Sequence, residues 1–483
     1  MDHLGKTGKI IYEIRRNMKK EDKKSSVAPI PEPRIKLPIL GHLLYLKGEL
    51  KKRFVDLSSS LGPIYRLKLG PYNVVVITGL DFIREVCDDS RFTKYLGPFA
   101  GALKNVFKYG FGFLSTDDPN WGPLYRILLP GLQQKILHDD GFPLIVKTLD
   151  SVFTKWDNAL EEKEFNLNDE VSRIVIDVIG LFQFNYDFNS INSPSPPIIV
   201  KALDEVAKIA ITLAFQGSFL SKLSFGKSRD LQQNLSILYK YADEIIENRK
   251  KLSTGHKDLV YNMLYEVDKT TGEKFEESMI RNQICGLLLG GVGTTINLVT
   301  FALFALMTHP IVLKKAYAEV DRTLGSPPVV QNFSRLTYIH QILDECLRIW
   351  PPAPVIERGP IEDTFLGGKY LIKKGESIWT VVTLIHSDKA LWGDDAESFN
   401  PDRFAQDLTA KRDPVAYLPF GVGRRACIGR QFSLFAATII LGMILQKYEL
   451  HLRPGHSPFS TSTLTPPDLW VTPKKRKFEK PIT

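Results

Sequence analysis

Hydrophobic and polar positions along most of the chain follow the period of an α-helix. This pattern appears around Ile174–Gln183, in the lysine- and glutamate-rich stretch Ser228–Lys251, and in Lys314–Leu324. Strand patterns are fewer. Ile64–Gly79 combines β-branched residues with a turn, as in a hairpin, and weaker strand-like stretches follow at Gly367–Val382 and near the C-terminus. The chain is therefore predicted to be mainly α with a minor β-rich part.

The longest apolar segment, from Ile284 to Met307, contains no charged residue and predicts one long buried helix. It is also long enough to cross a bilayer, which takes about 20 apolar residues, so a membrane-spanning helix is the alternative. Polar residues within the segment and the lack of aromatic belts at its ends favour the core helix of a soluble protein. These polar residues are Thr294, Thr295, Asn297 and Thr300.

Three glycines interrupt the middle of this segment, although each weakens a helix by about 1 kcal/mol relative to alanine. They are Gly290, Gly291 and Gly293. A phosphate-binding loop would need a lysine directly after the last glycine, but Thr294 stands there. The glycines must therefore serve another purpose.

Two basic clusters lie near the ends of the chain, within residues 1–24 and in PKKRK, Pro473–Lys477. We predict both to be solvated, flexible ends; nuclear import or weak contact with a membrane surface is the less favoured interpretation. The formal net charge of +9 comes from 63 basic and 54 acidic residues. This mild excess favours an ordinary solvated surface over nucleic-acid binding.

Prolines mark where the folded body begins. The sequence APIPEPRIKLPILG, residues 28–41, predicts an extended lead-in, because proline disfavours helix in the residue before it. We assign residues 1–28 to a flexible basic segment and 29–483 to one domain. No signal peptide or N-terminal anchor is recognisable, and the four cysteines lack zinc or disulfide spacing. These features indicate a soluble, cytoplasmic protein.

One cysteine stands out by its surroundings. Cys427 lies in LPFGVGRRACIGRQFSLFAATIILGMIL, Leu418–Leu445, between a glycine-rich loop and an apolar helix. The partial positive charge of a helix N-terminus is expected to lower the pKa of a nearby thiol, and Arg424 and Arg425 add positive charge. The flanking glycines allow the backbone to approach a large flat group. They are Gly421, Gly423 and Gly429.

The stretch Phe420–Gly429, FGVGRRACIG, resembles the ligand loop FGxGxRxCxG of the cytochrome P450 haem-thiolate enzymes at every fixed position. Glu345 and Arg348, in LDECLRIWPPAP, resemble the ExxR pair of that family, and Arg403, in FNPDRF, resembles its third member. The resemblance implies a cytochrome P450 fold over residues 29–483 and a buried Glu-Arg-Arg cluster. It also implies that Cys427 is the axial ligand to the iron of haem b.

Within that family the chain looks most like the soluble bacterial fatty-acid hydroxylase branch. The similar segments are SRFTKYL (Ser90–Leu96), NWGPLYRILLP (Asn120–Pro130), LWGDD (Leu391–Asp395) and RACIGRQF. Members of the branch are typically fused to a flavin reductase, whereas this chain ends at Thr483. The resemblance then implies electrons from NAD(P)H through a separate reductase, either a flavoprotein or a ferredoxin.

The resemblance also explains the glycine-interrupted helix. Gly290–Thr295, GGVGTT, lies over the family motif (A/G)Gx(D/E)T(T/S). In the family this helix crosses the distal face of the haem, and its glycines thin and locally distort it so that O2 fits. Thr294 is the implied hydroxyl that orients bound oxygen. Gly293 replaces the usual acid, whose carboxylate commonly relays protons.

Further haem contacts follow from the resemblance. The family's haem-facing helix touches the propionates through Trp121 and the residue four on, often basic, which is Tyr125 here with Arg126 next. Core packing is the competing interpretation for Trp121. Lys94 and Arg425 match propionate contacts in the branch. Within the ligand loop the expected cofactor-binding residues are Phe420, Gly421 and Gly429.

Substrate contacts are implied for several apolar segments. The residues are Phe111, Phe113, Leu114, Ala353, Val355, Ile356 and, in the turn Thr461–Thr465, Leu464. The branch holds a fatty carboxylate with an arginine and a tyrosine on the early hairpin, whereas the aligned positions here are Tyr72 and Val76. The expected substrate is therefore a fatty acid or another lipophilic small molecule.

These observations together predict a monomeric oxidoreductase that hydroxylates a lipophilic substrate, as in lipid metabolism, by inserting one oxygen atom from O2. Because Gly293 replaces the acid, a peroxide-driven or redox-neutral enzyme (peroxygenase, isomerase or dehydratase) is a rival hypothesis, although retention of Thr294 argues against it. Two further hypotheses are a non-catalytic haem-binding sensor and a membrane protein without haem. No nucleic-acid partner is expected.

Overall fold

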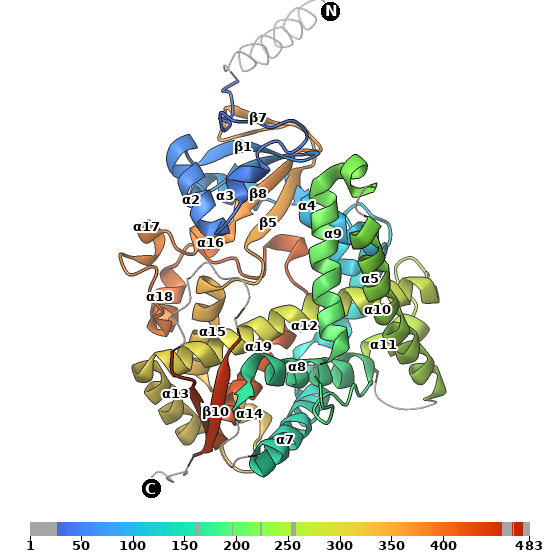
Figure 1. The fold of residues 1–483 in the computed structure, drawn as a ribbon, viewed down its shortest axis with the longest axis vertical. Coiled ribbons are helices and arrows are strands. Elements are labelled where there is room, and N and C mark those ends of the chain that lie inside the picture. Colours follow the sequence, from blue (N-terminus) through green and yellow to red (C-terminus); the bar gives the residue numbers. More distant parts are fainter. Residues whose placement is uncertain are drawn as a thin grey trace, which may run out of the picture.

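Long helices packed around one central helix form most of the molecule, and a smaller β-rich layer lies at one end (Figure 1). The structure, a computed structural model, describes residues 27–476 apart from 160–163, 196, 223–224, 253–256, 456–465 and 467. The predicted flexible segment 1–28 therefore lies outside the described residues except for its last two. The mainly α architecture with a minor β part confirms the prediction from the sequence pattern.

The long helices account for the bulk of the fold. They are α7 (Phe142–Ala159), α8 (Leu167–Phe184), α9 (Ile198–Lys222), α10 (Phe225–Lys251), α12 (Glu277–Thr308), α13 (Pro310–Thr323), α15 (Thr337–Ile349) and α19 (Arg430–Lys447). Shorter α-helices are α2 (Leu50–Leu61), α3 (Leu80–Val86), α4 (Pro98–Val106), α5 (Trp121–Leu128), α6 (Gln134–Ile136), α11 (Leu259–Tyr265), α14 (Val330–Phe333), α16 (Val382–Ile385), α17 (Lys389–Trp392) and α18 (Gln406–Lys411). Single helical turns of other types complete the set, namely η2 (Leu43–Leu46), η3 (Phe111–Phe113), η4 (Leu129–Leu132), η5 (Leu137–Gly141), η6 (Pro401–Phe404), η7 (Pro414–Ala416) and η8 (Gly423–Arg425).

The β-rich layer is a five-stranded sheet with the order β1-β2-β8-β5-β3. Its strands are β1 (Ile64–Leu69), β2 (Tyr72–Ile77), β3 (Phe92–Lys94), β5 (Val355–Pro360) and β8 (Ser377–Val381). β2 pairs in parallel with β8, and the other neighbours are antiparallel. Two smaller sheets are formed by β4 (Phe165–Asn166), β10 (Trp470–Lys475) and β9 (Tyr448–Leu452), and by β6 (Thr364–Leu366) with β7 (Tyr370–Ile372).

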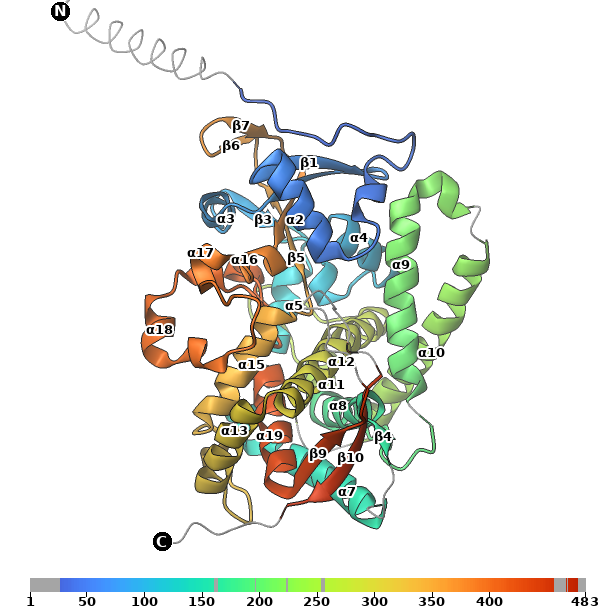
Figure 2. The same ribbon diagram turned by 60° about the vertical axis from the view of Figure 1, so that its left-hand side comes forward.

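The predicted hairpin forms, with Ile64 opposite Ile77 and Leu69 opposite Tyr72. The turn consists of Gly70 and Pro71, since β1 ends at Leu69 and β2 begins at Tyr72. Gly70 has a φ of 58°, in the left-handed region that favours glycine. An added Cβ there would also come within 2.3 Å of the Phe215 carbonyl oxygen, so the turn packs directly against α9. Figure 2 shows α9 and α10 side by side, with the upper end of α9 beside this layer.

The apolar segment forms α12, which runs through the middle of the helical part and packs against α8, α10, α15 and α19 (Figure 1). It is the one helix of the described residues that is long and apolar enough to cross a membrane, and 61% of its most apolar window is buried inside the protein. That position is the position of a core helix. α12 is a continuous α-helix from Glu277 to Thr308, so the local distortion expected at its glycines is not present as a π or 3-10 turn.

The C-terminal basic cluster is not a flexible end, contrary to the prediction. Pro473–Lys475 belongs to β10, where Pro473 lies opposite Leu450. Arg476 forms a bidentate ion pair with Asp321, with distances of 3.0 and 2.7 Å, and donates a hydrogen bond of 2.6 Å to the Leu445 carbonyl. Lys477 lies outside the described residues. The pairing of β10 and the ion pair of Arg476 therefore fix a segment that the sequence pattern assigned to a flexible end.

Candidate functional site

The loop before α19 presents Cys427 to solvent. Gly421 and Gly423 both have positive φ values, of 72° and 68°, which let the chain turn sharply twice within this loop. The Cys427 amide donates a hydrogen bond of 2.8 Å to the Phe420 carbonyl, which closes the loop on itself. The Cys427 carbonyl in turn accepts from the Arg430 amide at 3.4 Å, at the first turn of α19. The sulfur is thus held on a short closed loop of backbone.

The acidity of this thiol differs from the expectation. Although the sulfur is accessible, the protein atoms packed around it displace water, and this desolvation raises the pKa of Cys427; the backbone hydrogen bond at Gly429 and the charge of Lys94 act in the opposite direction. Proximity to the helix N-terminus is therefore the weaker of the two effects. A metal ion bound to the sulfur would supply the positive charge that deprotonates a coordinating thiol.

Asp89, which the sequence analysis missed, fixes the outer edge of the loop. Its carboxylate accepts hydrogen bonds from the Arg424 amide at 2.9 Å and from Arg358 Nη2 at 2.7 Å. Burial acts to raise the pKa of Asp89, but these two donors outweigh burial and lower it. A Cβ on Gly423 would come within 2.2 Å of Asp89 Oδ2, so only glycine fits where the carboxylate meets the loop.

Two partly buried cations lie together beside the loop. Arg425 donates hydrogen bonds to the Leu114 carbonyl at 2.7 Å and to Thr116 Oγ1 at 3.1 Å, and Lys94 Nζ donates to the Gly112 carbonyl. Burial lowers the pKa of Lys94 to about 8, with a further contribution from Arg425, and burial lowers the pKa of Arg425 to about 10. Among the described residues neither cation forms an ion pair with a carboxylate. The site therefore carries positive charge that suits an anionic ligand.

An aromatic stack leads from these cations to the central helix. The Arg425 guanidinium lies 4.7 Å from the ring centre of Trp121, whose ring stacks on Tyr125 at 5.7 Å and on Phe111 at 6.4 Å. Trp121 Nε1 is buried and has no hydrogen-bond partner among the described groups. A buried N–H without an acceptor is costly, so this atom points to a ligand that accepts from it.

Arg126, by contrast, turns away from this cluster. It forms a bidentate ion pair with Asp268, at 2.7 and 2.8 Å, in the connection between α11 and α12. Tyr125 therefore occupies the position that the resemblance assigned to a basic residue, and the neighbouring arginine does not replace it.

The glycines of α12 open a bare stripe on an otherwise buried helix. Gly290, Gly293 and Thr294 are exposed, whereas Val292 and Thr295 are buried. An added Cβ at Gly290 or Gly293 would meet no other atom within 4 Å. The Thr294 hydroxyl donates a hydrogen bond of 2.7 Å to the Gly290 carbonyl. Gly290 and Gly293 therefore leave the face of the helix beside Thr294 without side chains, which explains why glycines occur there.

Gly291 lies on another face of α12, where an added Cβ would contact Ile179 at 3.5 Å. That is an ordinary packing distance. Gly291 therefore packs against α8 and does not contribute to the bare stripe.

Gln283, also missed, joins α12 to the turn η3. Its side-chain nitrogen donates to the Tyr109 carbonyl, and its oxygen accepts from the Phe111 amide at 2.8 Å. Gln283 is only 1% exposed. One turn later, an added Cβ on Gly286 would lie 3.2 Å from the Cα of Gly110, so the two backbones approach closely. The signal available in the sequence was a polar residue directly before the segment Ile284–Met307.

The residues implied to contact substrate fall into three groups. Phe113 is partly buried and stacks on Phe107 at 6.2 Å, whereas Leu114 is only 1% exposed. Val355 and Ile356 are partly buried on β5, and Ala353 is exposed. Leu464 lies outside the described residues. On the hairpin, Val76 is fully buried, and Tyr72 faces Phe215 with ring centres 6.3 Å apart.

Glu345, Arg348 and Arg403 meet in a buried ionic cluster. Arg348 binds the Glu345 carboxylate through Nε at 2.6 Å and Nη2 at 2.7 Å, and Arg403 Nε lies 3.6 Å from the same carboxylate. Arg348 also donates to the carbonyls of His386 and Ala396, both at 2.6 Å. Burial raises the pKa of Glu345, and Arg348 opposes this effect. The cluster ties α15 to the segment before the Cys427 loop.

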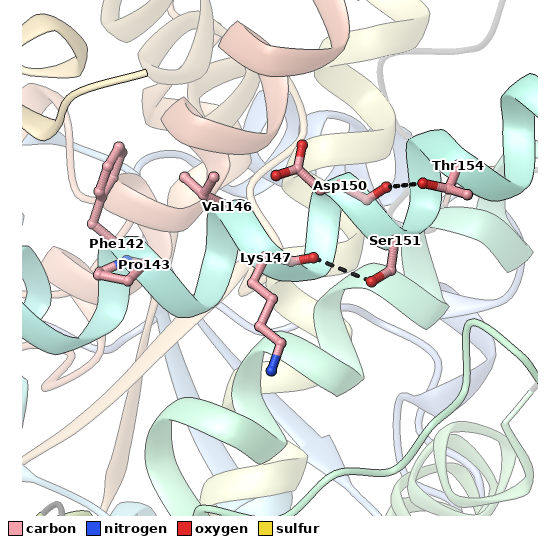
Figure 3. A pocket seen from close by; sticks show the side chains of 7 residues that line it. All are labelled: Phe142, Pro143, Val146, Lys147, Asp150, Ser151 and Thr154. Atoms are coloured by element: carbon pink, nitrogen blue, oxygen red, sulfur yellow. Dashed lines mark hydrogen bonds between the residues drawn. The ribbon is translucent and has the colours of Figure 1, made fainter. Parts of the chain in front are cut away.

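A shallow groove on α7 lies apart from these residues (Figure 3). Its hydroxyls are used within the helix, since Ser151 donates to the Lys147 carbonyl and Thr154 to the Asp150 carbonyl. None of the cysteine loop, the two cations or the bare stripe lines it. The chemistry-bearing residues are therefore those around Cys427 and Thr294.

Comparisons with known proteins match nearly the whole chain. The sequence profile of the family described as Cytochrome P450 matches residues 31–479. A bifunctional cytochrome P450/NADPH–P450 reductase of Bacillus cereus is 36% identical over 469 residues, which are 94% of this chain and 43% of the relative. The bifunctional cytochrome P450/NADPH–P450 reductase 2 of Bacillus subtilis is 35% identical over 463 residues, again 94% of this chain and 43% of the relative. The chain thus spans less than half of the length of these relatives.

Proposed function

Because the chain belongs to the cytochrome P450 family of monooxygenases, we propose that it is a haem-thiolate enzyme that inserts one oxygen atom from O2 into a lipophilic small molecule. The observation that carries this proposal is the accessible Cys427 thiol on its closed loop, next to the cations Lys94 and Arg425. The proposed substrate is a fatty acid or another apolar molecule, and the protein is proposed to act as a soluble cytoplasmic monomer.

The described residues fit haem b, iron protoporphyrin IX. Cys427 would hold the iron. Lys94, Arg425 and the unsatisfied Nε1 of Trp121 would donate to the two propionates, which matches the surplus positive charge at this place. The bare backbone at Gly290, one turn before Thr294, leaves this part of α12 without a side chain that would obstruct a flat ring. When bound, a haem with a thiolate ligand supplies the activation of O2.

The residues of α12 determine where the Thr294 hydroxyl lies and how protons can reach it. Thr294 keeps its hydroxyl at a fixed place through its hydrogen bond to the Gly290 carbonyl, and its oxygen can accept a further hydrogen bond. The preceding Gly293 offers no carboxylate to pass protons to that hydroxyl. Protons must therefore reach Thr294 through water or another residue.

We propose that the electrons come from NADPH through a separate reductase, which docks on the face that carries Arg424 and Arg430. Both side chains are exposed and flank the Cys427 loop. The relatives named above combine a cytochrome P450 with an NADPH–P450 reductase, which favours a flavoprotein as the donor. Exposed charges at such an interface mainly accelerate association and weaken with salt.

The haem-loaded protein is expected to form no product with NADPH and O2 alone, and to form product once a flavoprotein reductase is added. Product is measured by mass spectrometry with a panel of fatty acids and uncharged apolar compounds. The rate of product formation should fall as the salt concentration rises. At low salt, the variant in which both Arg424 and Arg430 are changed to glutamine should form product more slowly than wild type. Turnover by the isolated chain with NADPH would contradict the separate donor, and no product with any donor would favour a haem-binding sensor.

The lack of an acid beside Thr294 supports a second candidate, a peroxide-driven or redox-neutral haem-thiolate enzyme. The two candidates predict different effects of Gly293→Glu. If missing proton delivery limits an O2-dependent enzyme, the added carboxylate should raise the product formed per NADPH consumed by at least about twofold. The structure has room for it, because no atom lies within 4 Å of a Cβ at this position.

The matched control is Gly293→Gln, which has the same size without an acid. Both variants are compared with wild type for haem content and for product per NADPH with the same reductase. An equal ratio in all three folded, haem-loaded proteins would refute the proton-delivery account and favour the peroxide-driven or redox-neutral chemistry.

A further inference from the structure

His386, at the end of α16, uses both of its ring nitrogens. It is 1% exposed. The Leu418 amide donates a hydrogen bond of 3.0 Å to Nε2, so Nε2 is the acceptor and the ring proton is on Nδ1. Nδ1 lies 3.1 Å from the Arg348 carbonyl and donates to it. The ring therefore links Leu418 to Arg348.

A second contact joins His386 to the buried ionic cluster. Arg348 Nη1 donates a hydrogen bond of 2.6 Å back to the His386 carbonyl, and Arg348 also holds Glu345. Burial lowers the pKa of His386 to about 3, so the ring is neutral at physiological pH and keeps one donor and one acceptor. The orientation of the ring is thus fixed from both sides.

Leu418 is the point at which the Cys427 loop begins. Its carbonyl accepts from the Gly421 amide at 3.2 Å, and the Phe420 carbonyl between them accepts from the Cys427 amide at 2.8 Å. Hydrogen bonds therefore connect the Arg348 cluster through His386 to the backbone that carries the thiol.

The residue before Leu418 is anchored in the same region. The Tyr417 hydroxyl donates to the Asp344 carboxylate at 2.9 Å, and its ring faces the ring of His386 at 5.3 Å. Two successive residues at the base of the loop are thus fixed to α15 and to His386. Tyr417 is held through its side chain, whereas His386 binds the backbone amide of Leu418 and therefore holds the main chain of the loop itself.

We propose that His386 is a positioning residue for haem ligation. It holds the base of the Cys427 loop in the position from which the sulfur can reach the haem iron. This inference rests on the haem-thiolate function proposed above. Loss of the ring acceptor leaves the Leu418 amide buried without a partner, and the loop then relaxes to restore that hydrogen bond elsewhere. The consequence is a haem that more readily loses its thiolate ligand.

The test compares His386→Leu, His386→Gln and His386→Asn in haem-loaded, reduced, carbon monoxide-treated protein. The readout is the ratio of the thiolate-type absorption band to the shorter-wavelength band of haem without a thiolate ligand. A glutamine oxygen can take the place of Nε2 and accept from Leu418, whereas an asparagine nitrogen can only take the place of Nδ1. His340→Leu is the control, since His340 lies on α15, is partly buried and contacts Thr438 instead of the loop.

We expect the ratio to fall about tenfold in His386→Leu and His386→Asn, to recover in His386→Gln, and to stay at the wild-type value in His340→Leu. A role in stability alone would lower haem content without changing the ratio in the protein that remains folded. If His386→Leu does not fold, the comparison of glutamine with asparagine decides, and equal ratios in these two variants would overturn the inference.

A wild-type ratio in His386→Leu would also overturn the positioning role while leaving the proposed function intact. Absence of the thiolate-type band from wild-type protein would overturn the haem-thiolate function and this inference with it. The two failures are therefore distinguishable in one set of spectra.

Discussion

Replacing Cys427 with alanine is expected to reduce product formation by at least about a thousandfold per bound haem, which corresponds to about 4 kcal/mol of activation free energy. In the proposed enzyme the Cys427 thiolate would hold the haem iron, and its electron donation would supply the activation of O2. The side chain is small and solvent-exposed, so its loss should leave the packing of the loop and of α19 unchanged. Product is measured with an added reductase and normalised to haem content.

Cys87→Ala serves as the control for this substitution. Cys87 is partly buried and packs on the apolar cluster of the β-rich layer, and its thiol donates to or accepts from none of the described groups that are proposed to hold haem. This variant should retain wild-type product formation. If Cys427→Ala, folded and loaded with haem, retained activity within about tenfold of wild type, the assignment of Cys427 as the ligand would be wrong.

Arg348→Lys is expected to lower the free energy of unfolding by about 3–5 kcal/mol and to reduce the haem bound per chain. Arg348 is 1% exposed and fills a fixed set of acceptors, namely the Glu345 carboxylate and the carbonyls of His386, Ala396 and Ser398. A lysine ammonium is a compact charge that cannot reach all of these acceptors, so some remain buried without a donor. The measurements are urea unfolding followed by circular dichroism and haem content by absorbance.

The matched control is Arg84→Lys. Arg84 also binds two carboxylates, of Asp81 and Asp413, but its side chain is 53% exposed. Water can replace the lost contacts at this position, so the unfolding midpoint should stay the same. An unchanged midpoint and haem content in Arg348→Lys would show that the buried cluster does not support the Cys427 loop.

Elements with a strong local pattern could be predicted from the sequence. The uncharged run predicted α12, and the β-branched residues on either side of a turn at Gly70 predicted the hairpin of β1 and β2. The prediction for the C-terminal basic cluster was wrong, because charge alone does not reveal the partner of an ion pair. Asp321, which binds Arg476, comes from α13 and is distant in the sequence.

For the candidate site, too, local features could be predicted from the sequence and contacts between distant segments could not. Residues that share a short stretch with Cys427 could be identified from the motif, but the residues that hold this stretch could not. Asp89, just before β3, and His386, at the end of α16, reach it through contacts that only the fold brings about. Gln283 of α12 likewise holds the turn η3 from a distant part of the sequence. The direction of the Cys427 pKa shift was also missed, because burial depends on tertiary packing that a helix N-terminus does not disclose.

The central claim is that Cys427 ligates haem as a thiolate, and the absorption spectrum of the reduced, carbon monoxide-bound wild-type protein tests it most directly. The account predicts the long-wavelength band of a thiolate-ligated haem, and its loss in Cys427→Ala and Cys427→His. A folded wild-type protein that binds haem but shows only the shorter-wavelength band would contradict the account.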